Sequence, residues 1–159
     1  MGDSFIKTKI DHVDYKILRH LQANGRIANA DLAKLVNASP ATCHRRTQRL
    51  FDQGYVSGVR AEIVPERVER GALVMVGVVL DRSTPKSFAA FEKAITDLPF
   101  VLDCHLVAGD FDYFLKIRVR DIADFNRLHG EQLIALPGIR QTRTFFVMKE
   151  VIDNAPLEF

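Results

Sequence analysis

Nine consecutive residues, Ala72–Leu80, form the longest apolar run of the chain, and only Gly77 interrupts it. A helix that crosses a membrane needs about 20 apolar residues, so the run is too short to span one. Its length suits a buried β-strand. A half-exposed strand would alternate apolar and polar side chains, whereas this one is apolar on both faces. The fold must therefore bury both faces of the sheet that contains this strand.

The elements predicted after this strand give a βαββαβ order. Two helices are expected over about residues 85–98 and 122–136, where Thr84-Pro85 and Asp121 are typical helix starts. Strands are expected over 101–107, 111–119 and 139–151. This order builds a ferredoxin-like sandwich, an antiparallel sheet with two helices on one face. Because the helices cover only one face, we expect self-association to cover the other.

The first 60 residues predict three short helices. Asp11, with Asp14 three residues later, resembles a capping box in front of a helix over His12–Ala23. A second helix over about Asn29–Val36 should bury three apolar side chains. These are Leu32, Leu35 and Val36. Asn37 tolerates the left-handed conformation and so favours a turn.

The third helix begins with Ser39 as N-cap and Pro40 at its first position, and should run to about Gln53. At 100° per residue one face is apolar and the other is polar and basic. The polar face suits the major groove, because Arg can contact guanine or phosphate and Gln can contact adenine. The alternative is a small helical bundle with a solvated charged face. The candidate DNA-binding residues are Ser39, Ala41, Thr42, His44, Arg45, Gln48 and Arg49, with Arg46 on the flank.

The net charge of +2 is divided unevenly along the chain. Residues 1–60 hold ten basic and five acidic side chains, a net +5, and the remaining 99 hold twelve and fifteen, a net −3. A basic module joined to an acidic one favours a polyanion as the partner of the first. We predict a helix-turn-helix domain over 1–60, a connecting strand and linker over 61–71, and a ferredoxin-like sensing and oligomerisation domain over 72–159.

Other residue patterns argue against an enzyme, a metal protein and a secreted or membrane protein. The chain contains neither a glycine-rich phosphate loop nor a nucleophile elbow, and its five histidines are scattered, so we expect no catalytic site, metal or cofactor. Residues 1–10 carry charges and no apolar core, unlike a signal peptide. Cys43 and Cys104 stand 61 residues apart in apolar contexts, which favours reduced thiols and a cytoplasmic protein.

Two strings of residues resemble one known family. The first comprises Ile10-Asp11-His12-Val13-Asp14, Gly25-Arg26-Ile27, Ser39-Pro40 and Arg45-Arg46; the second comprises Cys104 to Tyr113 and Leu136-Pro137-Gly138 with Thr142-Arg143-Thr144. In this order they resemble the leucine-responsive regulatory protein family, the Lrp/AsnC or feast/famine regulators, and most closely its leucine-responsive branch. Asn37 departs from that family's usual turn glycine, and Thr47 from a usual aliphatic residue.

The resemblance implies a transcriptional regulator of amino-acid metabolism with a winged helix-turn-helix and a ferredoxin-like sensing domain. It implies partners: double-stranded DNA, an amino-acid effector such as leucine bound between dimers, and further copies of the chain, as a dimer and then an octamer. The implied effector site comprises Gly109, Asp110, Phe111, Asp112, Leu136, Thr144 and Phe146. Two other functions stay open from the residues: a regulatory amino-acid-binding subunit of a metabolic enzyme, and a nucleoid protein that wraps DNA.

Overall fold

The computed structural model describes residues 9–159, and the residues form two compact units. The first unit runs to Glu62 and includes the C-terminal residues Ile152–Phe159, and the second is Ile63–Val151. The sequence analysis placed residues 152–159 in the second domain, whereas the structure groups them with the first unit, where Leu157 and Phe159 contact the first helix. The predicted first domain begins in residues 1–8, and most of the segment compared with signal peptides also falls there; both lie outside the described residues.

Three helices form the first unit, as predicted: α1 (His12–Ala23), α2 (Asn29–Leu35) and α3 (Pro40–Asp52). Asp11 and Asp14 make the capping box at α1, and the Ser39 side chain accepts a hydrogen bond from the Thr42 N–H at the start of α3. Asn37 has the expected left-handed backbone, with φ of 54°. The core consists of Ile17, Leu32, Ala33, Val36, Cys43 and Leu50.

The prediction for Leu35 was wrong, because its side chain is 51% exposed. Helix α2 has only seven residues, and its buried stripe is narrow. The small side chain of Ala33, 1% exposed, occupies the inner position beside Leu32 and Val36. Leu35 lies one residue before Val36, which is about 100° away around the helix, and therefore points outward.

The segment after α3 contains no strand in the part of the chain that the structure describes. Residues 55–64 are irregular, and a 3-10 turn, η1 (Pro65–Val68), precedes the sheet. The expected connecting strand is therefore a linker that pairs with no strand among residues 9–159. Among residues 9–159, no helix is both long and apolar enough to cross a membrane.

The second unit has the predicted βαββαβ order: β1 (Ala72–Leu80), α4 (Pro85–Ile95), β2 (Val101–Leu106), β3 (Tyr113–Val119), α5 (Ile122–Leu128) and β4 (Ile139–Phe146). The strands lie in the order β2-β3-β1-β4 and every neighbouring pair is antiparallel. Helix α5 ends earlier than predicted and continues as one π-helical turn, His129–Leu133. This is a ferredoxin-like sandwich, which confirms the predicted fold class.

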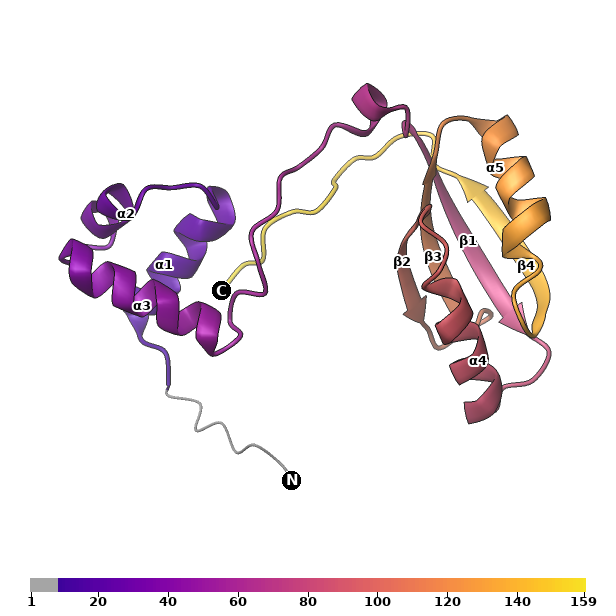
Figure 1. The fold of residues 1–159 in the computed structure, drawn as a ribbon, viewed down its shortest axis with the longest axis horizontal. Helices are drawn as coiled ribbons and strands as arrows, with labels where there is room; N and C mark the ends of the chain where they lie inside the picture. Colours follow the sequence, from indigo (N-terminus) through magenta and orange to yellow (C-terminus); the bar gives the residue numbers. More distant parts are fainter. Residues whose placement is uncertain (1–8) are drawn as a thin grey trace. The chain divides into compact units, whose positions relative to one another are not determined.

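Both helices of this unit pack on the same face of the sheet (Figure 1). The core on this face combines even-numbered residues of β1 and odd-numbered residues of β3 with side chains from both helices. Its members include Val74, Val76, Val78, Tyr113, Leu115, Ile117, Phe91, Ile95 and Phe125. The alternate residues of each strand point to the opposite face, which no element of the second unit covers.

Candidate DNA-binding surface and effector loop

The predicted polar face of α3 is exposed in the structure. Ala41, His44, Arg45 and Gln48 are exposed, and Cys43 and Leu50 on the opposite side are fully buried. Ser39 is exposed as the N-cap, and Thr42 is half-buried beside it, accepting a hydrogen bond from the Ser39 hydroxyl to its Oγ1 over 3.0 Å. Helix α3 therefore presents the predicted set of side chains on one accessible surface, held by the core below it.

The three arginines of α3 differ in what they contact. Arg45, Arg46 and Arg49 line one pocket. Arg46 Nη1 donates to Asp11 Oδ2 over 2.8 Å and to Asp14 Oδ1 over 3.0 Å, and Arg49 Nη2 donates to Asp14 Oδ2 over 2.5 Å. Arg45 has no ion pair or hydrogen bond through its side chain with any residue in 9–159. Of the three, Arg45 is therefore the one whose guanidinium is not paired with a described residue.

The network around Asp11 shifts two pKa values. The Asp14 N–H and the Arg46 guanidinium both donate to the Asp11 carboxylate, and these bonds lower the pKa of Asp11 from 3.8 to about 2. The carboxylates of Asp11 and Asp14 accept hydrogen bonds from Arg46 and raise its pKa, and Asp11 has the larger effect. Both groups are thus charged at neutral pH, and the ion pairs between α1 and α3 persist under those conditions.

The predicted effector loop lies between β2 and β3. Gly109 has φ of 147° and is exposed, as is Asp110. Asp112 instead holds the end of β1, because Oδ2 accepts from the Leu80 N–H over 2.7 Å and Oδ1 from the Ser83 hydroxyl over 3.3 Å. Asp110 makes no such bond through its side chain to a described residue.

Phe111 turns from this loop onto the uncovered face of the sheet. Its ring lies against Gly77, where a Cβ would come within 2.6 Å of ring carbons. The ring centroid is 5.5 Å from that of Phe114 and 6.4 Å from that of Phe145. The Arg143 guanidinium lies 5.7 Å from the Phe111 centroid. An aromatic cluster with a cation at its edge thus adjoins the loop.

The other predicted effector residues lie on the opposite side of the sheet. Thr144 and Phe146 pair with Val76 and Val74, whose side chains point toward the helices. The Phe146 ring packs edge-on against Phe125 of α5, and Leu136 packs against the core. Within one chain the structure therefore does not bring these three residues together with Phe111.

Sequence reasoning missed Arg143 and Phe145, which lie beside Phe111 in place of Thr144 and Phe146. Gly77 pairs with Arg143, and Met75 pairs with Phe145. The sequence did contain one indication of this cluster, Gly77, because a glycine inside an apolar strand often marks a place where another group approaches closely. The registry of β4 against β1, which decides the face, could not be derived from β4 alone.

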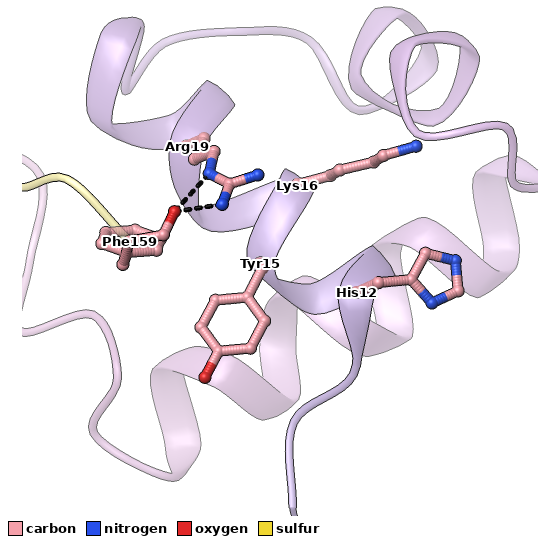
Figure 2. A pocket seen from close by; sticks show the side chains of 5 residues that line it. All are labelled: His12, Tyr15, Lys16, Arg19 and Phe159. Carbon is pink, nitrogen blue, oxygen red and sulfur yellow. Dashed lines mark hydrogen bonds between the residues drawn. The ribbon is translucent and has the colours of Figure 1, made fainter.

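Phe159 lines a second pocket beside α1, together with His12, Tyr15, Lys16 and Arg19. Figure 2 shows the Arg19 guanidinium donating to the backbone carbonyl of Phe159 through Nε and Nη2. The Phe159 and Tyr15 ring centroids are 5.9 Å apart. Residues 9–159 hold no group of three or more His, Cys, Asp or Glu side chains placed to bind a metal ion.

Comparison with known proteins gives matches over both units. The AsnC-type helix-turn-helix domain matches residues 10–50, and the Lrp/AsnC ligand binding domain matches residues 73–157. The leucine-responsive regulatory protein of Haemophilus influenzae is 47% identical over 89% of this chain and 86% of its own length. The protein of the same name from Escherichia coli K12 is 44% identical over 89% of this chain and 87% of its own length.

A solved structure extends the match to the three-dimensional fold. The transcriptional regulator of Neisseria meningitidis in complex with L-Met is similar to this chain with a TM-score of 0.89 and 31% identity, covering 94% of this chain and 97% of its own. Family domains in the predicted order, relatives above 40% identity and this fold confirm the resemblance found in the sequence. The chain belongs to the Lrp/AsnC family of transcriptional regulators.

Proposed function

We propose that this regulator reads double-stranded DNA with the exposed face of α3 and changes its DNA binding or assembly when a small amino acid binds between dimers. The proposal of DNA reading rests on the exposed face of α3, where His44, Arg45 and Gln48 are exposed and the opposite side of the helix is buried in the core. Ser39, Ala41 and Thr42 complete the surface, and Arg46 and Arg49 adjoin it. Arginine and glutamine supply the donors and acceptors that read base edges in the major groove.

The DNA-binding proposal is tested at Arg45. We expect Arg45→Ala to weaken binding to a specific duplex by about 1–3 kcal/mol, because it removes a guanine or phosphate contact. The probe is the duplex that the wild-type protein selects from a random-sequence pool, measured by electrophoretic mobility shift. Asp97→Asn, which alters an exposed carboxylate after α4, serves as the control. Unchanged affinity of Arg45→Ala would contradict the assignment.

For the effector we propose the 109–112 loop as the part of the site that this chain contributes. Gly109 is exposed and has open space where a Cβ would stand, so a carboxylate can approach its backbone, and the exposed Asp110 can accept from an ammonium group. The similar Neisseria meningitidis regulator was solved with L-Met, which supports an amino acid as the class of ligand. Leu136, Thr144 and Phe146 complete this site only if they come from another copy of the chain.

A thermal-shift screen tests the effector. Leucine, alanine, methionine, lysine, proline and asparagine are added separately, and a ligand that binds the folded state raises the melting temperature. We expect at least one of them to do so, and Asp110→Ala to abolish the rise while Asp97→Ala keeps it. If none of the six changes the melting temperature, operator affinity or sedimentation, the sensing proposal fails.

Self-association completes the proposal. The uncovered sheet face carries Met75, Val79, Phe114 and Phe145, of which Phe145 is 47% exposed. A second copy of the chain would remove these apolar side chains from water. We propose a dimer formed through this face and an octamer built from dimers. We also propose a cytoplasmic location, because a DNA-reading protein must share the compartment of the DNA.

A further inference from the structure

We propose that Asp14 is a positioning residue for DNA recognition: its buried carboxylate holds Arg46 and Arg49 away from DNA and leaves the reading to His44, Arg45 and Gln48. This inference rests on the proposed DNA binding by α3. It goes further by dividing the basic residues of that helix into two that fix its orientation and one that contacts the nucleic acid.

The geometry around Asp14 uses both of its carboxylate oxygens. Oδ1 accepts from Arg46 Nη1 over 3.0 Å, and Oδ2 accepts from Arg49 Nη2 over 2.5 Å and from the Asp11 N–H over 3.1 Å. Asp14 lies in α1 and both arginines lie in α3. Two arginines from successive turns of one helix, bound to one carboxylate of another, fix the rotation of α3 about its own axis.

Burial makes this arrangement hard to exchange for contacts with DNA. The Asp14 side chain is 1% exposed, and the side chains of Arg46 and Arg49 are 25% and 33% exposed. A carboxylate out of water must stay paired, because an unpaired buried charge is strongly unfavourable. An arginine that left Asp14 to reach a phosphate would remove one of the two cations that neutralise this buried carboxylate. Arg45 is exposed and pays no such cost.

The charges of the arginines and of the two carboxylates also indicate that one of the three arginines is left for DNA. Arg45, Arg46 and Arg49 together carry +3, and Asp11 and Asp14 carry −2, so the cluster presents a net +1 to DNA. The number of phosphates that a protein neutralises sets how steeply its affinity falls with salt, by about 0.9 in the log–log slope per phosphate. The loss of slope in a single arginine variant therefore shows whether that arginine neutralises a phosphate of the DNA.

The first experiment measures salt slopes of single arginine variants. The duplex selected by the wild-type protein is titrated at several salt concentrations, together with poly(dI-dC) as unrelated DNA. We expect Arg45→Ala to lower the slope by about 0.9 for each DNA-bound subunit, and Arg46→Ala and Arg49→Ala to leave it at the wild-type value while loosening α3. An equal drop for Arg46→Ala or Arg49→Ala overturns the inference.

The second experiment removes the charge of Asp14. Asp14→Asn keeps the size of the side chain, frees Arg49 and leaves Arg46 bonded to Asp11 alone. We therefore expect a slope on poly(dI-dC) steeper by about 1 for each DNA-bound subunit and a roughly tenfold lower preference for the selected duplex. A residue that only stabilised the fold would weaken both affinities without steepening the slope. Asp97→Asn removes the same charge from the second unit and should change neither quantity.

A third variant and the wild type separate the possible failures. In Asp14→Asn combined with Arg46→Ala and Arg49→Ala, the steeper slope should disappear, because no arginine is left to be released. If it persists, or if Asp14→Asn alone leaves slope and preference unchanged, the inference is overturned. If the wild-type protein itself binds neither DNA, the proposed function has failed instead.

Discussion

At the scale of single residues, Asp11 combines a helix cap with an ion pair, and its charge contributes to stability. Its pKa of about 2 lies below the 3.8 of an unperturbed carboxyl. Because the folded pKa is the lower one, ionised Asp11 stabilises the folded protein above pH 3.8, and this contribution is lost as the pH falls toward 2.

Asp11→Asn separates these two roles, because asparagine also caps helices but carries no charge. We expect a lower free energy of unfolding than for the wild type at neutral pH, with the difference closing as the pH falls from 3.8 to about 2. Denaturant titrations over this range measure the difference. Asp11→Ala also loses the cap and should cost about 1 kcal/mol more at every pH. A difference between wild type and Asp11→Asn that stays constant with pH would refute the charge contribution.

At the level of secondary-structure elements, β1 and the 109–112 loop can pack closely because residue 77 is a glycine and leaves room for the Phe111 ring. A Cβ at residue 77 would lie 2.6 Å from the Phe111 ring, so Gly77→Ala must displace that ring or strain the strand. Overpacking of this kind costs about 1–3 kcal/mol. We expect Gly77→Ala to lower the melting temperature, and Gly77→Ala with Phe111→Ala to lose less stability than the two single changes together predict.

The matched control is Gly130→Ala, because nothing lies within 4 Å of a Cβ built at that position. We expect this change to leave the melting temperature nearly unaltered. Strict additivity of Gly77→Ala and Phe111→Ala in a double-mutant cycle would mean that the ring does not press on residue 77 in solution.

Helix boundaries could be predicted from the sequence where neighbouring residues determine them. Asp11, Ser39, Thr84 and Asp121 cap helices through bonds within three residues, so the sequence located four of the five helix starts from their caps. The extent of α5 was not predictable in this way. Its backbone changes to a π-helical turn at His129, whose ring packs on Phe125 and whose Nε2 lies 3.0 Å from Thr142 Oγ1, a contact with a distant strand.

At the scale of the whole molecule, the sequence predicted the order of both units and the charge of each. It could not predict that Leu157–Phe159 pack on α1, because these bonds join backbone atoms to Arg19 and Gln22 about 135 to 140 residues away. Backbone carbonyls have no sequence signature. The uncovered face of the sheet was predictable, since it follows from an apolar run with helices on only one side.

Assembly through that face can be tested with two neighbouring residues of β4. Phe145 lies on the uncovered face with its ring stacked against Phe114 at 6.2 Å, whereas Phe146 points to the helix side and packs on Phe125. We expect Phe145→Ser to lower the sedimenting mass toward that of the monomer, because it removes a large apolar side chain from the interface.

Phe146→Ser makes the same chemical change one residue away, on the other side of the strand. Phe146 is 41% exposed and Phe145 is 47% exposed, so the two positions lose similar amounts of accessible ring. We expect Phe146→Ser to reduce the melting temperature through its lost contact with Phe125 and to keep the wild-type mass. Equal masses for the two variants in sedimentation velocity, whether both reduced or both unchanged, would show that the uncovered face is not the surface through which the chains associate.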